Sequence, residues 1–129
     1  MEKAKILVVE DQNIVALNIK NKLKNLGYSV PGTAATGEEA IRKAELMNAD
    51  IVLMDIKLKG NMDGIEAASE IKKRIGIPVL YMTASIDDEI LDRAKTTEPA
   101  GYISKPFKEQ DLHSTIEIAL HKHRAEKKG

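Results

Sequence analysis

Four short apolar runs, each followed by polar or charged residues, constrain most strongly what this chain can fold into. The runs cover residues 6–9, 51–54, 79–82 and 101–104. Short runs that are almost continuously apolar are typical of strands in a parallel sheet covered on both faces. The segments between the runs carry apolar residues at helical spacing. This alternation predicts an α/β fold built on a parallel sheet.

The remaining segments complete the expected alternation of five strands and five helices. Thr36-Gly37-Glu38-Glu39 has the spacing of a capping box and is expected to open the second helix. A weaker strand is predicted within residues 28–35, where Pro31-Gly32 interrupts the pattern and favours an edge position. The predicted helices cover residues 13–26, 36–47, 63–74, 87–95 and the chain from about residue 108. We expect one domain over residues 1–122, then a basic tail or the start of a linker over 123–129.

Composition narrows the classes of partner. With 129 residues, 43% of them hydrophobic, the chain is long enough for one domain with a proper core. The 20 basic and 20 acidic residues cancel, so the global charge favours neither nucleic acid nor a membrane surface. The absence of cysteine excludes disulfides and thiolate zinc sites. We therefore expect a cytoplasmic protein whose chain binds neither nucleic acid nor membrane directly.

Acidic, hydroxyl and lysine side chains stand where the predicted strands end. Because the carboxyl ends of parallel strands meet at one edge of a sheet, these side chains are expected to converge there. Three carboxylates a few ångströms apart repel one another, by roughly 4 kcal/mol per pair at 4 Å and an effective dielectric constant of ~20. A small hard cation such as Mg²⁺ removes that repulsion. The converging residues are Glu10, Asp11, Asp55, Thr83 and Lys105.

The carboxylates predict a site for Mg²⁺ (or Mn²⁺) around a reactive aspartate. Asp55 would be both a metal ligand and a nucleophile, because aspartate carboxylates can accept a phosphoryl group covalently. Asp11 would bind the ion directly, and Glu10 through a metal-bound water. The backbone carbonyl of Lys57 would complete the metal ligands.

The other two side chains would act on the phosphoryl oxygens. Lys105 would supply a positive charge and Thr83 a hydroxyl donor, in keeping with a reaction that depends mostly on positioning and charge neutralisation. Each residue taken alone also has an ordinary structural explanation, as a helix cap, a turn residue or a strand former. The functional interpretation rests on their occurring together, in order, at successive strand ends.

Together, Glu10-Asp11, Asp55, Thr83-Ala84 and Lys105-Pro106-Phe107 resemble the signature of the response-regulator receiver domain, over residues 5–122. The resemblance implies a flavodoxin-like, doubly wound five-stranded parallel sheet in the order 2-1-3-4-5, with five helices. It implies Mg²⁺-dependent transfer of a phosphoryl group to Asp55 from a sensor histidine kinase or a phosphotransfer protein. It also implies a cis peptide bond between Lys105 and Pro106.

The resemblance further implies how a signal would leave the site. Tyr102 stands where the family has an aromatic switch residue. A phosphoryl group would draw the Thr83 hydroxyl inward, and Tyr102 would rotate into the vacated space. The fourth helix, fifth strand and fifth helix would then bind a downstream protein that the sequence does not identify. A homodimer, if one forms, would use the fourth and fifth helices.

Two departures from the family pattern fall near the acceptor. The family usually has a proline four residues after the acceptor and a glycine eight residues after it. Here Lys59 takes the first place and Gly64 comes one residue late, so we expect an altered loop before the third helix. The acidic pair is Glu10-Asp11 where two aspartates are commoner, which should adjust the metal geometry.

These features predict a phosphoacceptor signalling domain and not a turnover enzyme. It would at most phosphorylate itself from small donors and dephosphorylate slowly, because neither Lys57 nor Ser85 is an obvious base for activating water. One alternative is a flavodoxin-like binding module that works without phosphate. Another is a Mg²⁺-dependent phosphohydrolase with an aspartyl nucleophile, which would normally have an aspartate at the position of Lys57.

Overall fold

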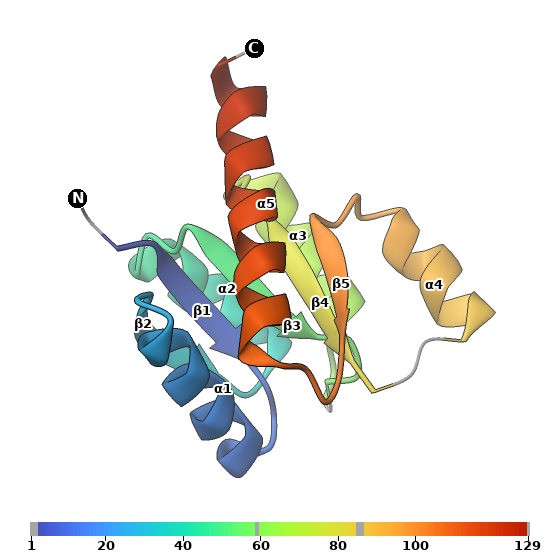
Figure 1. Ribbon diagram of the computed structural model, residues 1–129. Helices are drawn as coiled ribbons and strands as arrows, with labels where there is room; N and C mark the ends of the chain where they lie inside the picture. The colour runs from blue at the N-terminus through green and yellow to red at the C-terminus, as the bar shows by residue number, and fades with distance from the viewer. Residues whose placement is uncertain (1–2, 59, 85–86, 129) are drawn as a thin grey trace.

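The computed structural model describes residues 3–58, 60–84 and 87–128, in which strands and helices alternate (Figure 1). Lys59 and Ser85, both named above, lie outside the described residues. The strands are β1 (Lys5–Val9), β2 (Ser29–Ala34), β3 (Ile51–Asp55), β4 (Val79–Thr83) and β5 (Gly101–Ser104). The helices are α1 (Asn13–Asn25), α2 (Gly37–Leu46), α3 (Gly64–Arg74), α4 (Asp88–Lys95) and α5 (Glu109–Lys128).

All five strands are parallel, and their order is β2-β1-β3-β4-β5, which confirms the expected fold. β1, β3 and β4 lie inside the sheet and are buried along almost their whole length, as their apolar runs predicted. β2 lies at one edge, as expected. Its register against β1 shifts between Lys5 and Leu7, so the segment around Pro31 bulges without ending the strand.

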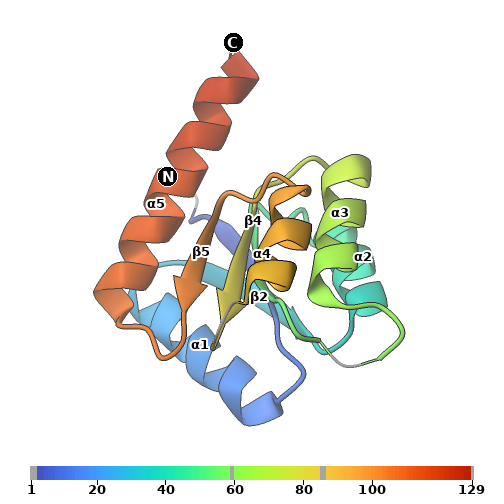
Figure 2. The ribbon, with the colours of Figure 1, turned by 90° about the vertical axis from the view of Figure 1, so that its right-hand side faces the viewer.

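Alternate side chains of each strand enter two separate cores. Ile6 and Val8 of β1 pack on the side of α1 and α5, whereas Leu7 and Val9 pack on the side of α2 and α3. Figure 2 shows this layering, with α1 and α5 on one side of the sheet and α2, α3 and α4 on the other. Both faces of the sheet are therefore covered, which is why the central strands carry no polar alternation.

Side chains cap the starts of α2, α3 and α4. Thr36 accepts a hydrogen bond from the Glu39 amide at 3.1 Å, but the Glu39 carboxylate accepts from the Ala35 amide at 2.7 Å, so the predicted capping box forms only in half. A complete box is present at α3, where Asp63 and Glu66 each accept from the other's amide, at 2.9 and 3.1 Å. The Gly64 amide donates to the Ile56 carbonyl at 3.2 Å, which places the first turn of α3 close to the end of β3.

α5 is longer than expected from the change in composition. It continues through residues 123–128, the segment interpreted above as a tail or the start of a linker, so that segment is helical here. Figure 1 shows its last turns extending beyond the sheet, on the edge away from the strands' arrowheads. None of the described helices combines the length and the apolar character needed to cross a membrane.

Candidate metal centre

Three carboxylates meet at the carboxyl edge of the sheet. Glu10 and Asp11 directly follow β1, and Asp55 ends β3, the strand beside it. One carboxylate oxygen from each residue lies within 4.8 Å of the other two. Glu10 is only 3% exposed and Asp55 8%, so these negative charges are largely withdrawn from water. Such a cluster is costly unless cations or hydrogen bonds compensate it.

Lys105 supplies part of the compensation. Its Nζ lies 2.7 Å from Glu10 Oε1 and 3.6 Å from Asp55 Oδ2. The Lys105 amide donates to the Thr83 carbonyl at 2.8 Å, which holds the start of the β5–α5 loop beside the end of β4. The peptide bond between Lys105 and Pro106 is cis. One ammonium group thus contacts two of the three carboxylates.

The carboxylate oxygens that Lys105 does not contact leave room for a cation in the cluster. The Gln12 amide donates to Glu10 Oε2, and the Lys57 amide donates to Asp55 Oδ1, both at 3.2 Å. Asp11 Oδ2 is buried and has no hydrogen-bond partner among the described residues. A buried, unpartnered carboxylate oxygen beside two further carboxylates is a donor set suited to a hard divalent ion. The acidic cluster is therefore consistent with a metal site.

Thr83 and Tyr102 occupy different surroundings. Thr83 is buried at the end of β4, the strand next to Asp55 in the sheet. The Tyr102 ring packs instead into the core on the side of α2, α3 and α4, with its centroid 5.9 Å from that of Tyr81. Burial raises the pKa of Tyr102, and its hydroxyl oxygen has no hydrogen-bond partner in the described part of the chain. The Tyr81 hydroxyl, by contrast, is paired with Thr97 Oγ1 at 2.7 Å.

Tyr102→Phe is expected to leave the free energy of unfolding unchanged or to raise it by up to about 1 kcal/mol, because it removes a buried hydroxyl that lacks a partner. The matched control is Tyr81→Phe, which also deletes a buried hydroxyl but breaks the bond to Thr97 and should cost about 1 kcal/mol. Urea unfolding of the two variants compares them. A larger loss of stability in Tyr102→Phe than in Tyr81→Phe would mean that the Tyr102 hydroxyl does make a stabilising hydrogen bond.

Gly64 is a site residue whose role the sequence did not reveal. Its position in the sequence indicates only an altered loop before α3. A Cβ at Gly64 would overlap the carbonyl oxygen of Asp55 and lie 3.0 Å from the Cα of Ile56. The Gly64 amide also donates to the Ile56 carbonyl at 3.2 Å. The first residue of α3 therefore packs directly on the main chain of Asp55. In the sequence, the only sign of this contact was the spacing between Asp55 and the glycine.

A second polar cluster lies apart from the carboxylates. The Tyr28 hydroxyl donates to Glu117 Oε2 at 2.6 Å and lies 3.2 Å from His113 Nδ1, and burial is the main cause that raises the pKa of Tyr28. His113 is an exposed residue of α5, and it shares Tyr28 with Glu117, one turn along the helix. The cluster ties α5 to the start of the edge strand.

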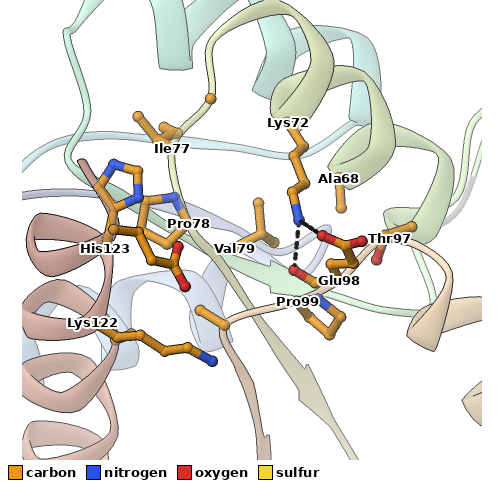
Figure 3. A pocket seen from close by; sticks show the side chains of 14 residues that line it. Ala68, Lys72, Ile77, Pro78, Val79, Thr97, Glu98, Pro99, Lys122 and His123 are labelled. Carbon is orange, nitrogen blue, oxygen red and sulfur yellow. Dashed lines mark hydrogen bonds and ion pairs between the residues drawn. The ribbon is translucent and has the colours of Figure 1, made fainter. Parts of the chain in front are cut away.

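A hollow of about 480 Å³ lies at the opposite edge of the sheet, between the end of α3, the start of β4 and α5 (Figure 3). Lys72 reaches across it to Glu98 and donates to its carbonyl and its carboxylate, at 3.0 and 3.1 Å. None of the predicted site residues is among the described residues that line it. The hollow is therefore separate from the acidic centre.

The comparisons with known proteins agree with this arrangement. Residues 6–117 match the family model described as the response regulator receiver domain. The transcriptional regulatory protein PdtaR of Mycobacterium tuberculosis is 35% identical over 120 residues, which cover 93% of this chain and 58% of PdtaR. The alkaline phosphatase synthesis transcriptional regulatory protein PhoP of Bacillus subtilis is 33% identical, over 90% of this chain and 48% of PhoP. This chain thus spans about half the length of these curated relatives.

Solved structures of receivers have the same fold. The signal receiver domain of a modulated diguanylate cyclase from Desulfovibrio desulfuricans G20 is 39% identical, with a TM-score of 0.92 and coverage of 97% of this chain and 99% of that one. A CheY-like response regulator receiver domain protein from Methanospirillum hungatei JF-1 is 28% identical, with a TM-score of 0.87 and coverage of 97% and 99%. On these grounds, the chain belongs to the response regulator receiver domains, the phosphoacceptor signalling modules of two-component systems.

Proposed function

We propose that this chain accepts a phosphoryl group on Asp55 from the phosphohistidine of a sensor histidine kinase or a phosphotransfer protein, in a reaction that requires Mg²⁺ or Mn²⁺. The observation that carries the proposal is the cluster of Glu10, Asp11 and Asp55, with Lys105 in contact with two of the three. Incorporation of one phosphoryl group at Asp55 from acetyl phosphate tests it directly.

In the proposed reaction, a carboxylate oxygen of Asp55 forms a bond to phosphorus. The phosphorus–nitrogen bond of the phosphohistidine breaks and the imidazole leaves with the electron pair, or acetate leaves when acetyl phosphate is the donor. Asp55 Oδ2 lies 3.6 Å from the Lys105 amine. The other oxygen, Oδ1, accepts a hydrogen bond from the Lys57 amide. This hydrogen bond restricts rotation of the carboxylate and keeps the acceptor oriented.

The residues around Asp55 would divide the remaining work. Glu10, Asp11, Asp55 and the Lys57 carbonyl would hold the metal ion, which when bound supplies positive charge to the phosphoryl oxygens. Lys105 would move its contact from the carboxylates to the transferred phosphoryl group, and Thr83 would donate its hydroxyl to it. Lys105 is within 3.6 Å of Asp55, so this change needs only a small displacement.

The signal would leave through the surface of α4, β5 and α5, with Thr83 and Tyr102 as the switch pair. Tyr102 supports this role because its hydroxyl is buried without a partner, so that its inward orientation is opposed by the cost of one unpaired polar group. A small change at Thr83 can then shift the balance between orientations. Residues 1–122 would form the receiver.

The phosphohydrolase alternative has less support than the receiver reading. Lys57 is exposed, and it stands where a hydrolase of that kind would need an acid or base. In the binding-module alternative, the carboxylate cluster would serve another ligand. The contact of Lys105 with Glu10 and Asp55 supports the phosphoacceptor over the binding module, because it places an ammonium group where phosphoryl oxygens would lie.

Removal of one carboxylate is expected to abolish metal-dependent stabilisation. An ion that binds only the folded chain stabilises it by about 2.7 kcal/mol when its free concentration is 100 times Kd. Mg²⁺ should therefore raise the melting temperature of the wild type but not that of Asp11→Asn. Without metal, Asp11→Asn should be at least as stable as the wild type, because Asp11 adds negative charge to a cluster that already has it.

Asp87→Asn is the matched control for this experiment. Asp87 caps α4 at the same edge of the sheet, with its Oδ1 accepting from the Ile90 amide at 2.8 Å, and asparagine is an equally good cap. This variant should keep the full response to Mg²⁺. Equal stabilisation of Asp11→Asn and Asp87→Asn by Mg²⁺ would place the bound ion elsewhere.

A further inference from the structure

Few contacts attach α4 to the rest of the fold. Ala94 is the one residue of Asp88–Lys95 that is buried, and Ile90 and Leu91 are only partly covered. Figure 1 shows the helix on the side of the molecule away from β2. In the described residues, a single side-chain polar contact joins this helix to another element: Arg93 Nη2 lies 2.8 Å from Asp63 Oδ2.

Asp63 connects that contact to the phosphoacceptor. Its other carboxylate oxygen, Oδ1, accepts from the Glu66 amide at 2.9 Å and completes the capping box of α3. The next residue, Gly64, packs on the carbonyl of Asp55 and donates to that of Ile56 at 3.2 Å. The Arg93 guanidinium is therefore linked to the main chain of Asp55 through two consecutive residues, Asp63 and Gly64.

An open groove lies between α3 and α4. It has a volume of about 590 Å³ and is lined by Met62 and by residues of both helices, among them Ile65 and Arg93. Beyond α4, Thr97 is fixed by the bond between its Oγ1 and the Tyr81 hydroxyl at 2.7 Å. Because Ala94 is the one buried residue of α4, the ion pair is a substantial part of what holds this helix.

We propose that Arg93 is a positioning residue, whose ion pair with Asp63 couples the placement of α4 to the main chain of Asp55. α4 is then joined to the acceptor region twice, covalently through the segment that follows Thr83 and electrostatically through Asp63. The coupling of α4 to a phosphorylated Asp55 rests on the proposed function. The coupling of α4 to the first turn of α3 does not. By linkage, whatever moves the Asp55 main chain shifts α4, and the reverse.

Hydrogen–deuterium exchange of the whole chain tests the ion pair itself. Arg93→Gln and Asp63→Asn should each raise the exchange rate of the α4 amides two- to five-fold, the range expected when a partly exposed ion pair of up to about 1 kcal/mol is lost. Asparagine keeps the cap on α3, so Asp63→Asn removes mainly the charge. The double variant should exchange no faster than either single one, and Arg93→Lys should restore part of the protection.

Arg74→Gln is the matched control. Arg74 pairs with Glu70 at 3.0 Å, an ion pair of similar exposure that lies wholly within α3, so its loss should not change exchange in α4. Raising NaCl to 1 M should speed α4 exchange in the wild type but not in Arg93→Gln, because salt screens the pair. Additive effects of the two single variants, or α4 exchange equal to that of the wild type, would overturn the proposal.

A second measurement adds beryllium fluoride with Mg²⁺, a mimic of the phosphoryl group, and follows the same amides. The wild type should show a change in α4 exchange on binding, and Arg93→Gln should show at most half of it while still binding the mimic. A full response in Arg93→Gln would overturn the coupling to the acceptor. Absence of binding in the wild type would count against the proposed function, and the exchange measured without the mimic would still decide whether Arg93 positions α4.

Discussion

Asp55→Asn is expected to abolish phosphorylation of this chain. The wild type incubated with acetyl phosphate and Mg²⁺ should gain one phosphoryl group, measured as the intact mass, and the variant none. The physical reason is that the amide lacks the negatively charged oxygen that forms the bond to phosphorus. Asparagine has nearly the same shape, and its carbonyl oxygen can still accept from the Lys57 amide as Asp55 Oδ1 does, so the fold should persist.

The controls separate the acceptor from its surroundings. Chelation of the metal should prevent the adduct in the wild type, because the carboxylates then keep their mutual repulsion and their contact with Lys105. Asp87→Asn, at the same edge of the sheet, should be phosphorylated like the wild type. An adduct that persists in Asp55→Asn would mean that another residue is the acceptor, and no adduct in the wild type with several small donors would favour a module that works without phosphate.

Gly64→Ala is expected to destabilise the fold by about 3 kcal/mol, the upper end of the usual cost of overpacking. For a chain of this length the melting temperature would fall by roughly 10 °C. The added methyl group would meet the Asp55 carbonyl oxygen and the Ile56 Cα, which are backbone atoms that cannot rotate away. Alanine is the better helix former, so the loss would occur despite a favourable change in propensity. Urea or thermal unfolding measures it.

Gly37→Ala is the matched control, because Gly37 is likewise the first residue of a helix, α2. A Cβ there would lie 2.9 Å from Cγ and Sδ of Met62, the flexible side chain of a partly buried residue. Methionine can rearrange at little cost, so we expect a loss of about 1 kcal/mol or less. If Gly37→Ala lost as much stability as Gly64→Ala, the special role of the contact between Gly64 and Asp55 would be wrong.

Most of the fold followed from patterns that are local in the sequence. The runs at residues 6–9, 51–54 and 79–82 are strands because their residues are apolar on both faces, and only a sheet covered twice buries both. The first four helices, α1 to α4, begin and end within one or two residues of their predicted bounds. α5 passed the predicted end of the domain because charged residues such as Lys122 and Arg124 are good helix formers, so a change in composition was a poor signal for a helix end.

The meeting of the acidic residues could be anticipated for a topological reason. Parallel strands end at the same edge, so residues that follow neighbouring strands must lie close together, whatever the details of packing. The structure brings Glu10, Asp11 and Asp55 within a few ångströms and sets Lys105 against two of them. Tyr102 was less predictable, because whether its ring lies inside or outside depends on how Tyr81 and α4 pack beside it.

The sequence by itself therefore determined the α/β alternation, the parallel sheet and the carboxylate-rich edge, since each depends on residue type and on spacing along one strand or helix. Only the tertiary structure decided the contacts between side chains of different helices and loops. Arg93 meets Asp63, and Gly64 meets the Asp55 carbonyl, because of the rotation and depth at which α3 and α4 lie against the sheet. Those quantities arise from the packing of the whole core, and no local pattern carries them.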